Sequence, residues 1–193
     1  MNKTRLEAFS DAVIAIIMTI MVLDLKIPHG DDLEALKTLR PIFLTYVLSF
    51  IYLGIYWNNH HHMLQATKKV NGKVLWANLL LLFWLSMVPF ATSWLGENYL
   101  APLPTAIYGC VLLASAISYT LLQTKLTKHV DGENALLAEA VGGDLKGKLS
   151  MMLYIIAIPL AFVNQWISDA IYVAVAIIWF IPDRRIENKI NHE

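Results

Sequence analysis

Charged side chains occur inside the first long apolar segment of the sequence, and they suggest where chemistry takes place. Arg5, Glu7 and Asp11 open this segment, and the next twelve residues carry no charge before Asp24. A charge placed in an apolar membrane core costs at least about 2.5–3.5 kcal/mol. Such side chains usually face other protein groups. Arg5 and Glu7 can extend to the membrane surface, whereas Asp11 lies deeper and indicates either a buried hydrogen-bonded cluster that fixes helix packing or a proton or cation site.

The same segment carries an aliphatic stripe with one polar member. Ile16, Ile20 and Leu23 follow one another at steps of four and three, so they share one face of a helix. Thr19 is the polar side chain in that stretch. A stripe of this kind either packs against neighbouring helices or lines a pore, where aliphatic rings exclude water and a hydroxyl contacts the ion.

Three consecutive histidines, His60, His61 and His62, end the second apolar segment. Consecutive residues of a helix point about 100° apart, so the three rings cannot converge on one metal ion. Paired ligands on a helix need a spacing of three or four residues. We therefore expect no metal site, and we expect one or two of these rings to point inward toward Ser10 or Asp11.

The third apolar segment begins with further polar candidates at the same predicted depth. Asn78 needs a hydrogen-bond partner on another helix if it lies in a membrane. Trp76 is either an anchor at the membrane surface or a member of the polar cluster, and Trp57 has the position of an anchor. Pro89 should kink this segment, because proline lacks the N–H that continues a helix.

Composition places these segments in a lipid bilayer. Of the 193 residues, 57% are hydrophobic and 16% are charged, whereas soluble domains have about 45–50% and about 25%. The formal net charge of +0 argues against a nucleic-acid partner. The single cysteine, Cys110, excludes an internal disulfide framework and a thiolate metal cluster. We expect one membrane domain over residues 1–193.

Six stretches are apolar enough to be read as membrane spans. They cover approximately residues 5–27, 42–64, 74–95, 105–126, 149–166 and 168–182. The last two form a tight hairpin, because one continuous helix would be too long for a bilayer. Polar residues mark its turn, namely Asn164, Gln165, Ser168 and Asp169. The predicted fold is an all-α membrane protein with six transmembrane helices.

The basic residues predict the orientation of these spans. Twelve of the 15 lie in the N-terminus, the second and fourth loops and the C-terminus, whereas the other side has Lys26, Lys37 and Arg40. Cytoplasmic loops carry the excess of Lys and Arg. Both termini are therefore expected in the cytoplasm, in agreement with an even number of spans.

The run from Arg5 to Asp11 resembles the signature of the transmembrane protein 175 family, the potassium channels of lysosomes and their bacterial relatives. That signature is Arg, three residues, then Phe-Ser-Asp, and here the Phe-Ser-Asp is Phe9, Ser10 and Asp11. It opens the first helix of a six-helix unit. The aliphatic stripe that follows, the histidines of the second segment and the Trp-x-Asn of the third strengthen the resemblance.

The resemblance implies roles for particular residues. A single six-helix unit is similar to the bacterial members, which assemble as homotetramers with the first helix lining a central pore. The constriction would fall at Ile16, with further layers at Ile20 and Leu23 and the threonine layer that favours potassium at Thr19. A polar network on the cytoplasmic side would join Arg5, Ser10 and Asp11 to one of His60 to His62 and to Trp76 or Asn78.

The function that the resemblance implies is passive conduction of potassium, with modest preference over sodium, across a bacterial plasma membrane. No enzymatic activity, cofactor or partner other than further copies of the chain is expected. A proton-coupled transporter of small cations, with Asp11 as the titrating group, is the alternative. An intramembrane enzyme is disfavoured by the missing ligands, and a structural subunit of a larger complex remains open.

Overall fold

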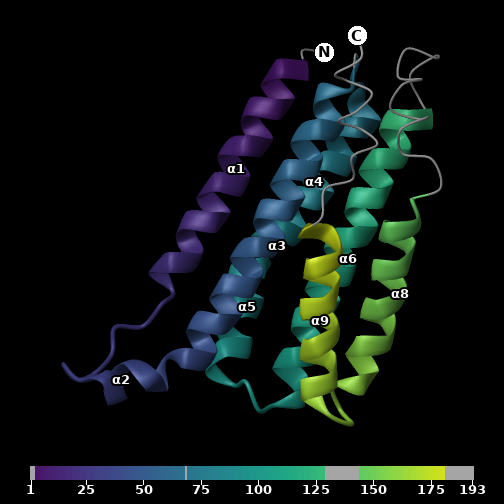
Figure 1. The fold of residues 1–193 in the computed structure, drawn as a ribbon. Coiled ribbons are helices and arrows are strands. Elements are labelled where there is room, and N and C mark those ends of the chain that lie inside the picture. Colours follow the sequence, from purple (N-terminus) through teal and green to yellow (C-terminus); the bar gives the residue numbers. More distant parts are fainter. Residues whose placement is uncertain (1–2, 68, 129–143, 181–193) are drawn as a thin grey trace.

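A computed structural model of the chain describes residues 3–67, 69–128 and 144–180. In these ranges all regular elements are helices, and the long ones run side by side while the short α2 lies beyond one end of the bundle (Figure 1). The helices are α1 (Lys3–Leu23), α2 (Leu33–Thr38), α3 (Arg40–Gln65), α4 (Gly72–Ser86), α5 (Val88–Glu97), α6 (Pro102–Lys128), α8 (Leu145–Leu160) and α9 (Gln165–Phe180).

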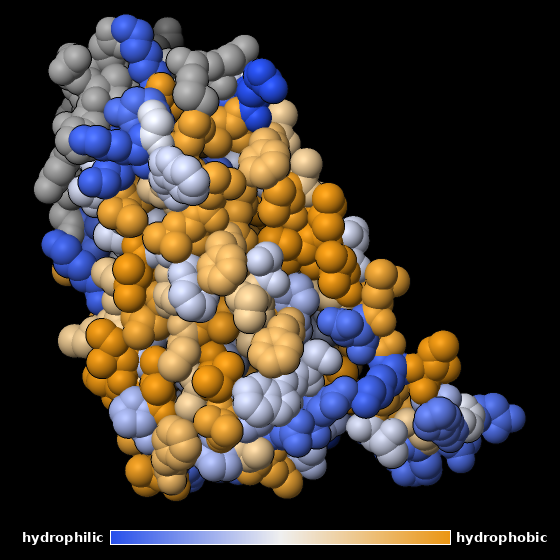
Figure 2. All heavy atoms as spheres, turned by 180° about the vertical axis from the view of Figure 1, so that it is seen from behind, coloured by the Kyte–Doolittle hydropathy of each residue, from blue (hydrophilic) through white to orange (hydrophobic). Residues whose placement is uncertain are grey.

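Four helical segments are long and apolar enough to cross a bilayer. They are Lys3–Leu23, Arg40–Gln65, Gly72–Glu97 and Pro102–Thr127. The remaining pair, α8 and α9, has 16 residues in each helix, so each is about 24 Å long against a hydrocarbon core of about 30 Å. Figure 2 shows a largely hydrophobic flank with hydrophilic residues gathered toward the two ends. The chain is therefore an all-helical integral membrane protein.

The third apolar segment is interrupted near Pro89, as its sequence predicts. Helix α4 ends at Ser86 and α5 begins at Val88, so Met87 joins the two. The proline has no N–H to donate, and its ring clashes with the preceding turn of a helix. The interruption separates two packing partners, because α4 lies chiefly against α6 and α5 chiefly against α3.

The turn of the last hairpin lies earlier than the sequence predicted. Helix α8 ends at Leu160 and α9 begins at Gln165, so Ser168 and Asp169 lie inside α9 rather than in the turn. The Asn164 side chain ends the turn by accepting the Trp166 N–H at 3.0 Å. Because the turn itself contains apolar residues, hydropathy did not distinguish it from the helix. The predicted end of the sixth span, residue 182, falls outside the described residues.

The first helix is shorter than predicted, and a short helix that follows it was missed. Helix α1 ends at Leu23 rather than at residue 27, and Pro28 lies in the segment beyond it. Helix α2 begins after Asp32, whose carboxylate accepts the Ala35 N–H at 2.8 Å. An aspartate in this capping position is a signal for a helix start, but six residues are too few to show an apolar period.

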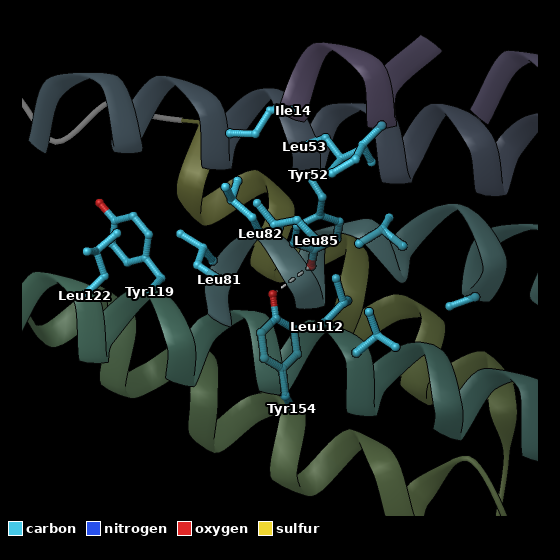
Figure 3. Packing of buried hydrophobic residues seen from close by; sticks show 14 of the residues in the cluster. Ile14, Tyr52, Leu53, Leu81, Leu82, Leu85, Leu112, Tyr119, Leu122 and Tyr154 are labelled. Atoms are coloured by element: carbon cyan, nitrogen blue, oxygen red, sulfur yellow. Dashed lines mark hydrogen bonds between the residues drawn. The ribbon is translucent and has the colours of Figure 1, made fainter. Parts of the chain in front are cut away.

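The hydrophobic core is formed by buried residues of α1, α3, α4, α5, α6, α8 and α9, and leucine is its commonest residue (Figure 3). Polar side chains inside it bond to one another. Tyr154 donates to the Tyr52 oxygen at 3.2 Å, and Tyr52 in turn donates to the Tyr172 carbonyl at 2.5 Å. Helix α1 stands at the edge of this bundle and contacts α3, α4 and α5 (Figure 1). One side of α1 thus has no packing partner among the described helices of the subunit.

Candidate functional site

Helix α1 has a buried face and an exposed face. The buried face is formed by Leu6, Ser10, Ile14, Ile17 and Met21. The opposite face carries the predicted stripe, and Ile16 is 56%, Ile20 44% and Leu23 80% exposed. Such exposed aliphatic surface on a membrane helix meets either lipid or another protein chain.

Thr19 lies on the exposed face and is oriented by its own helix. Its hydroxyl donates to the Ile16 carbonyl at 2.9 Å. Because the hydrogen is directed back to the backbone, the oxygen retains its lone pairs as acceptors. The Thr19 oxygen can therefore serve as a ligand for a cation that passes along this face.

Three fully buried polar side chains join α1, α3 and α4. The Asn78 amide donates to the Ser10 oxygen at 2.9 Å, and Nε2 of His60 lies 2.7 Å from the Asn78 carbonyl oxygen. The Ser10 hydroxyl itself donates to the Leu6 carbonyl at 2.8 Å. Each side chain is 0% exposed, so each bond replaces one that water would otherwise make.

The directions of these bonds determine the state of His60. The Asn78 oxygen can only accept, so the bonded Nε2 of His60 carries a hydrogen. The other ring nitrogen, Nδ1, is buried and has no hydrogen-bond partner among the described residues. A hydrogen there would be an unpaired buried donor. The network is therefore complete with a neutral His60 ring.

Asp11 takes a partner that the sequence did not suggest. Its carboxylate accepts the indole N–H of Trp57 at 3.0 Å. Trp57 was interpreted as a membrane-surface anchor, but it also stacks on His61 with ring centroids 5.9 Å apart. The spacing of four between these two rings places them on one face of α3 and was the available signal. Asp11 is thus bonded to α3 outside the buried trio.

A second carboxylate of α1, Glu7, also faces α3. Its Oε1 lies 3.4 Å from Nδ1 of His61, within ion-pair distance if the ring is protonated. Sequence interpretation assigned Glu7 only to the membrane surface. His62 contacts the edge of the His61 ring with centroids 5.7 Å apart. Of the histidine triplet, His60 therefore points into the buried trio and His61 toward α1.

Two predicted members of the network, Arg5 and Trp76, do not join it, and Phe9 of the motif also lies outside it. Arg5 is exposed and makes no hydrogen bond or ion pair with the described residues, and Phe9 is half-exposed on the outer side of α1. Trp76 is 76% exposed. Since it precedes the buried Asn78 by two residues, the two side chains point about 200° apart on one helix. The described residues also contain no group of His, Cys, Asp or Glu that could hold a metal.

The chain is similar to known proteins of one family. The family described as "Endosomal/lysosomal potassium channel TMEM175" matches residues 5–89, which include α1, α3 and α4. A potassium channel of Chryseobacterium sp. is 51% identical over 190 residues, covering 98% of each chain. A potassium channel of Streptomyces collinus is 32% identical over 175 residues, covering 85% of each.

A solved structure extends the likeness to the second half of the chain. The crystal structure of a lysosomal potassium-selective channel TMEM175 homolog from Chamaesiphon minutus superimposes with a TM-score of 0.79. It is 27% identical in sequence, and the match covers 94% of this chain and 97% of that one. The protein therefore belongs to the TMEM175 family, a family of ion channels and not of enzymes.

Proposed function

We propose that this protein conducts potassium passively through a pore lined by α1 helices from four copies of the chain. The observation that carries the proposal is the exposed stripe on α1. Ile16, Thr19, Ile20 and Leu23 are all exposed on a helix whose other face is packed into its own subunit. Relatives that match nearly the whole chain bear the name potassium channel.

The aliphatic members of the stripe act as the gate. Four-fold repetition places rings of Ile16, Ile20 and Leu23 along roughly 10 Å of the pore axis, at 1.5 Å per helical residue. A narrow aliphatic ring excludes water. It therefore blocks ions, because an ion inside it has neither water nor protein ligands around it. A small rotation or spreading of the α1 helices widens the rings and lets water enter.

Thr19 supplies the polar layer between these rings. Its hydroxyl hydrogen is held by the Ile16 carbonyl, so four hydroxyl oxygens face a passing cation. Few oxygen ligands replace only part of the hydration shell of the ion. Preference for potassium over sodium is therefore modest.

The polar contacts at the start of α1 set the position of the pore helix. Ser10, Asn78 and His60 are buried within one subunit and lie away from the exposed stripe. The contacts of Asp11 with Trp57 and of Glu7 with His61 join α1 to α3. These groups act in assembly and gating and do not coordinate the permeating ion.

Six spans complete each subunit, with the α8–α9 hairpin as the last two. The hairpin packs against α6 and α3, and α9 is apolar although shorter than the four long segments. Lys3 and Arg5 begin α1, and Lys69 and Lys73 lie where α3 gives way to α4, at the same end of the bundle. By the excess of basic residues, this end faces the cytoplasm of a bacterial cell.

The test is a recording of the purified protein in a planar bilayer under a potassium–sodium gradient. Discrete unitary currents with a reversal potential shifted toward that of potassium support the proposal. Ile16→Asn controls for a closed gate, because a polar ring should wet the constriction. If both proteins are silent although each is reconstituted as a tetramer, the channel proposal fails. Saturable, proton-driven uptake without unitary steps would instead identify a transporter that uses Asp11.

A further inference from the structure

A hollow separate from the α1 stripe lies among α3, α6, α8 and α9. It has about 470 Å³ of space not filled by protein atoms, a figure that includes the solvent at its open mouth. Five aromatic residues contribute to its lining, namely Tyr52, Tyr56, Tyr119, Tyr154 and Trp179. No residue of α1 contributes to it, so the hollow is not part of the proposed pore.

The protein itself uses most of the hydrogen-bond donors around this hollow. Trp179 donates to the Ser150 oxygen at 2.8 Å, and Ser150 donates to the Lys146 carbonyl at 2.8 Å. Tyr119 donates to the Asn59 carbonyl at 3.3 Å. Tyr154 donates to Tyr52 at 3.2 Å, and the two rings point toward one another in Figure 3. These bonds orient the rings and leave mainly acceptors for an occupant.

Among the groups that remain available are two acceptors and one hydroxyl. The Asn59 amide nitrogen bonds the Ile55 carbonyl at 2.8 Å, while its oxygen has no partner among the described residues. Asp144 uses one carboxylate oxygen to accept the Gly147 N–H at 3.1 Å and keeps the other. The Tyr56 hydroxyl also lacks a hydrogen-bond partner in the described part of the chain, and its ring meets Tyr119 edge to face at 6.0 Å.

We infer that this hollow binds a primary alkylammonium group. A carboxylate and an amide oxygen match the N–H groups of such a cation, and aromatic faces attract it further. Its alkyl chain can lie along Ile55 and Ala116, which also line the hollow. The same chemistry occurs in an amine-bearing lipid headgroup and in a soluble alkylamine.

Basic residues near Asp144 do not fill this role themselves. Lys146 and Lys148 belong to the first turn of α8, yet neither contributes to the lining. Asp144 makes no ion pair within the described residues, and its carboxylate caps the start of α8. The carboxylate is thus held in place by the backbone at Gly147, with one oxygen left for an external cation.

The test measures the thermal stability of the purified protein in a neutral maltoside detergent. We expect n-butylammonium to raise Tm saturably above the value at the same ionic strength of potassium chloride. n-Butanol lacks the charge and should give no saturable rise in Tm. Tetramethylammonium lacks N–H groups and should raise Tm less than n-butylammonium does. Equal stabilisation by potassium and n-butylammonium would overturn the inference.

Variants locate the effect in the hollow. Asp144→Asn retains a side-chain oxygen that can cap α8 and should weaken n-butylammonium binding roughly tenfold or more, because a charge-assisted bond is lost. Tyr56→Phe removes one hydroxyl and should weaken binding less. Asp169→Asn is the matched control, because Asp169 is a half-buried carboxylate of the same hairpin that does not line the hollow. Unchanged binding to Asp144→Asn would contradict the assignment.

A comparison of two lipids identifies the natural source of the amine. In nanodiscs of phosphatidylethanolamine, the lipid headgroup should compete with n-butylammonium and reduce its effect on Tm, whereas phosphatidylcholine should not. Competition identifies a lipid site, and its absence in both lipids identifies a site for soluble amines. Both results concern binding alone, so they stand or fall independently of ion conduction.

Discussion

Two neighbouring isoleucines of α1 show how different the two faces of this helix are. Ile16 is 56% exposed and Ile17 is 4% exposed, although the two residues have the same side chain. The face of Ile17 packs into the subunit and includes Ser10 of the buried polar trio. The face of Ile16 has no packing partner among the described residues of its own chain. Position around the helix, rather than residue type, thus separates stabilising residues from proposed pore residues.

Replacing each isoleucine in turn should give the largest contrast. Ile17→Ala removes buried atoms and should lower the free energy of unfolding by about 2–5 kcal/mol. Ile16→Ala should change stability by much less but raise the leak current, because a smaller ring excludes water poorly. Thermal unfolding and bilayer recording of both variants measure this. A leak caused by Ile17→Ala alone would place the pore on the other face.

The buried trio can be broken at its centre with a nearby control. Asn78→Ala leaves the Nε2 hydrogen of His60 unpaired and removes the donor to Ser10, so we expect a loss of about 1–3 kcal/mol. Trp76→Ala, two residues away on the exposed side of α4, should cost less in detergent. Denaturation of the two variants under the same conditions makes the comparison. Equal losses would show that the trio adds little to stability.

The contact between Asp11 and Trp57 should matter for assembly, with a smaller effect on stability. Asp11→Ala and Trp57→Phe each remove the bond measured at 3.0 Å, worth about 1 kcal/mol or somewhat more with a charged acceptor. Both variants should reduce the tetramer fraction in detergent, and the double variant should be little worse than either. Size-exclusion chromatography with light scattering measures that fraction. An intact Asp11→Ala tetramer that no longer conducts would contradict this role.

Thr19 should give the smallest effect on the protein and a specific effect on selectivity. Thr19→Val keeps the shape of the side chain and removes its oxygen. The reversal potential under mixed potassium and sodium should therefore shift toward the value of a pore that does not prefer potassium over sodium. Thr19→Ser retains the oxygen and serves as the control. Folding should barely change in either variant, because Thr19 is exposed in the subunit. Identical reversal potentials for Thr19→Val and the parent protein would remove Thr19 from selectivity.

The spacing of apolar residues and the position of a proline made several features of the fold predictable from the sequence. The stripe at Ile16, Ile20 and Leu23 is exposed on one side of α1, because a period of three and four residues follows from helix geometry alone. The interruption near Pro89 was predictable for an equally local reason, since proline lacks a backbone donor. The resemblance carried by Arg5 to Asp11 agrees with the family match over residues 5–89.

Features that depend on how helices face one another were not predictable. Hydropathy could not locate the turn before Gln165, because apolar residues occupy the turn itself. Trp57 had the position of a membrane anchor, and only the approach of α3 to α1 shows that its indole meets Asp11.

By itself the sequence determined an all-helical membrane protein, the helical stripe on its first helix and the family to which it belongs. Those properties follow from composition, from a short repeat period and from a local motif. All three can be determined from one sequence without knowing how the helices pack. The tertiary structure alone decided that His60 rather than His62 meets Asn78, and that Trp76 stays outside the network. Such choices depend on the rotation of each helix about its axis, which packing against the other helices sets.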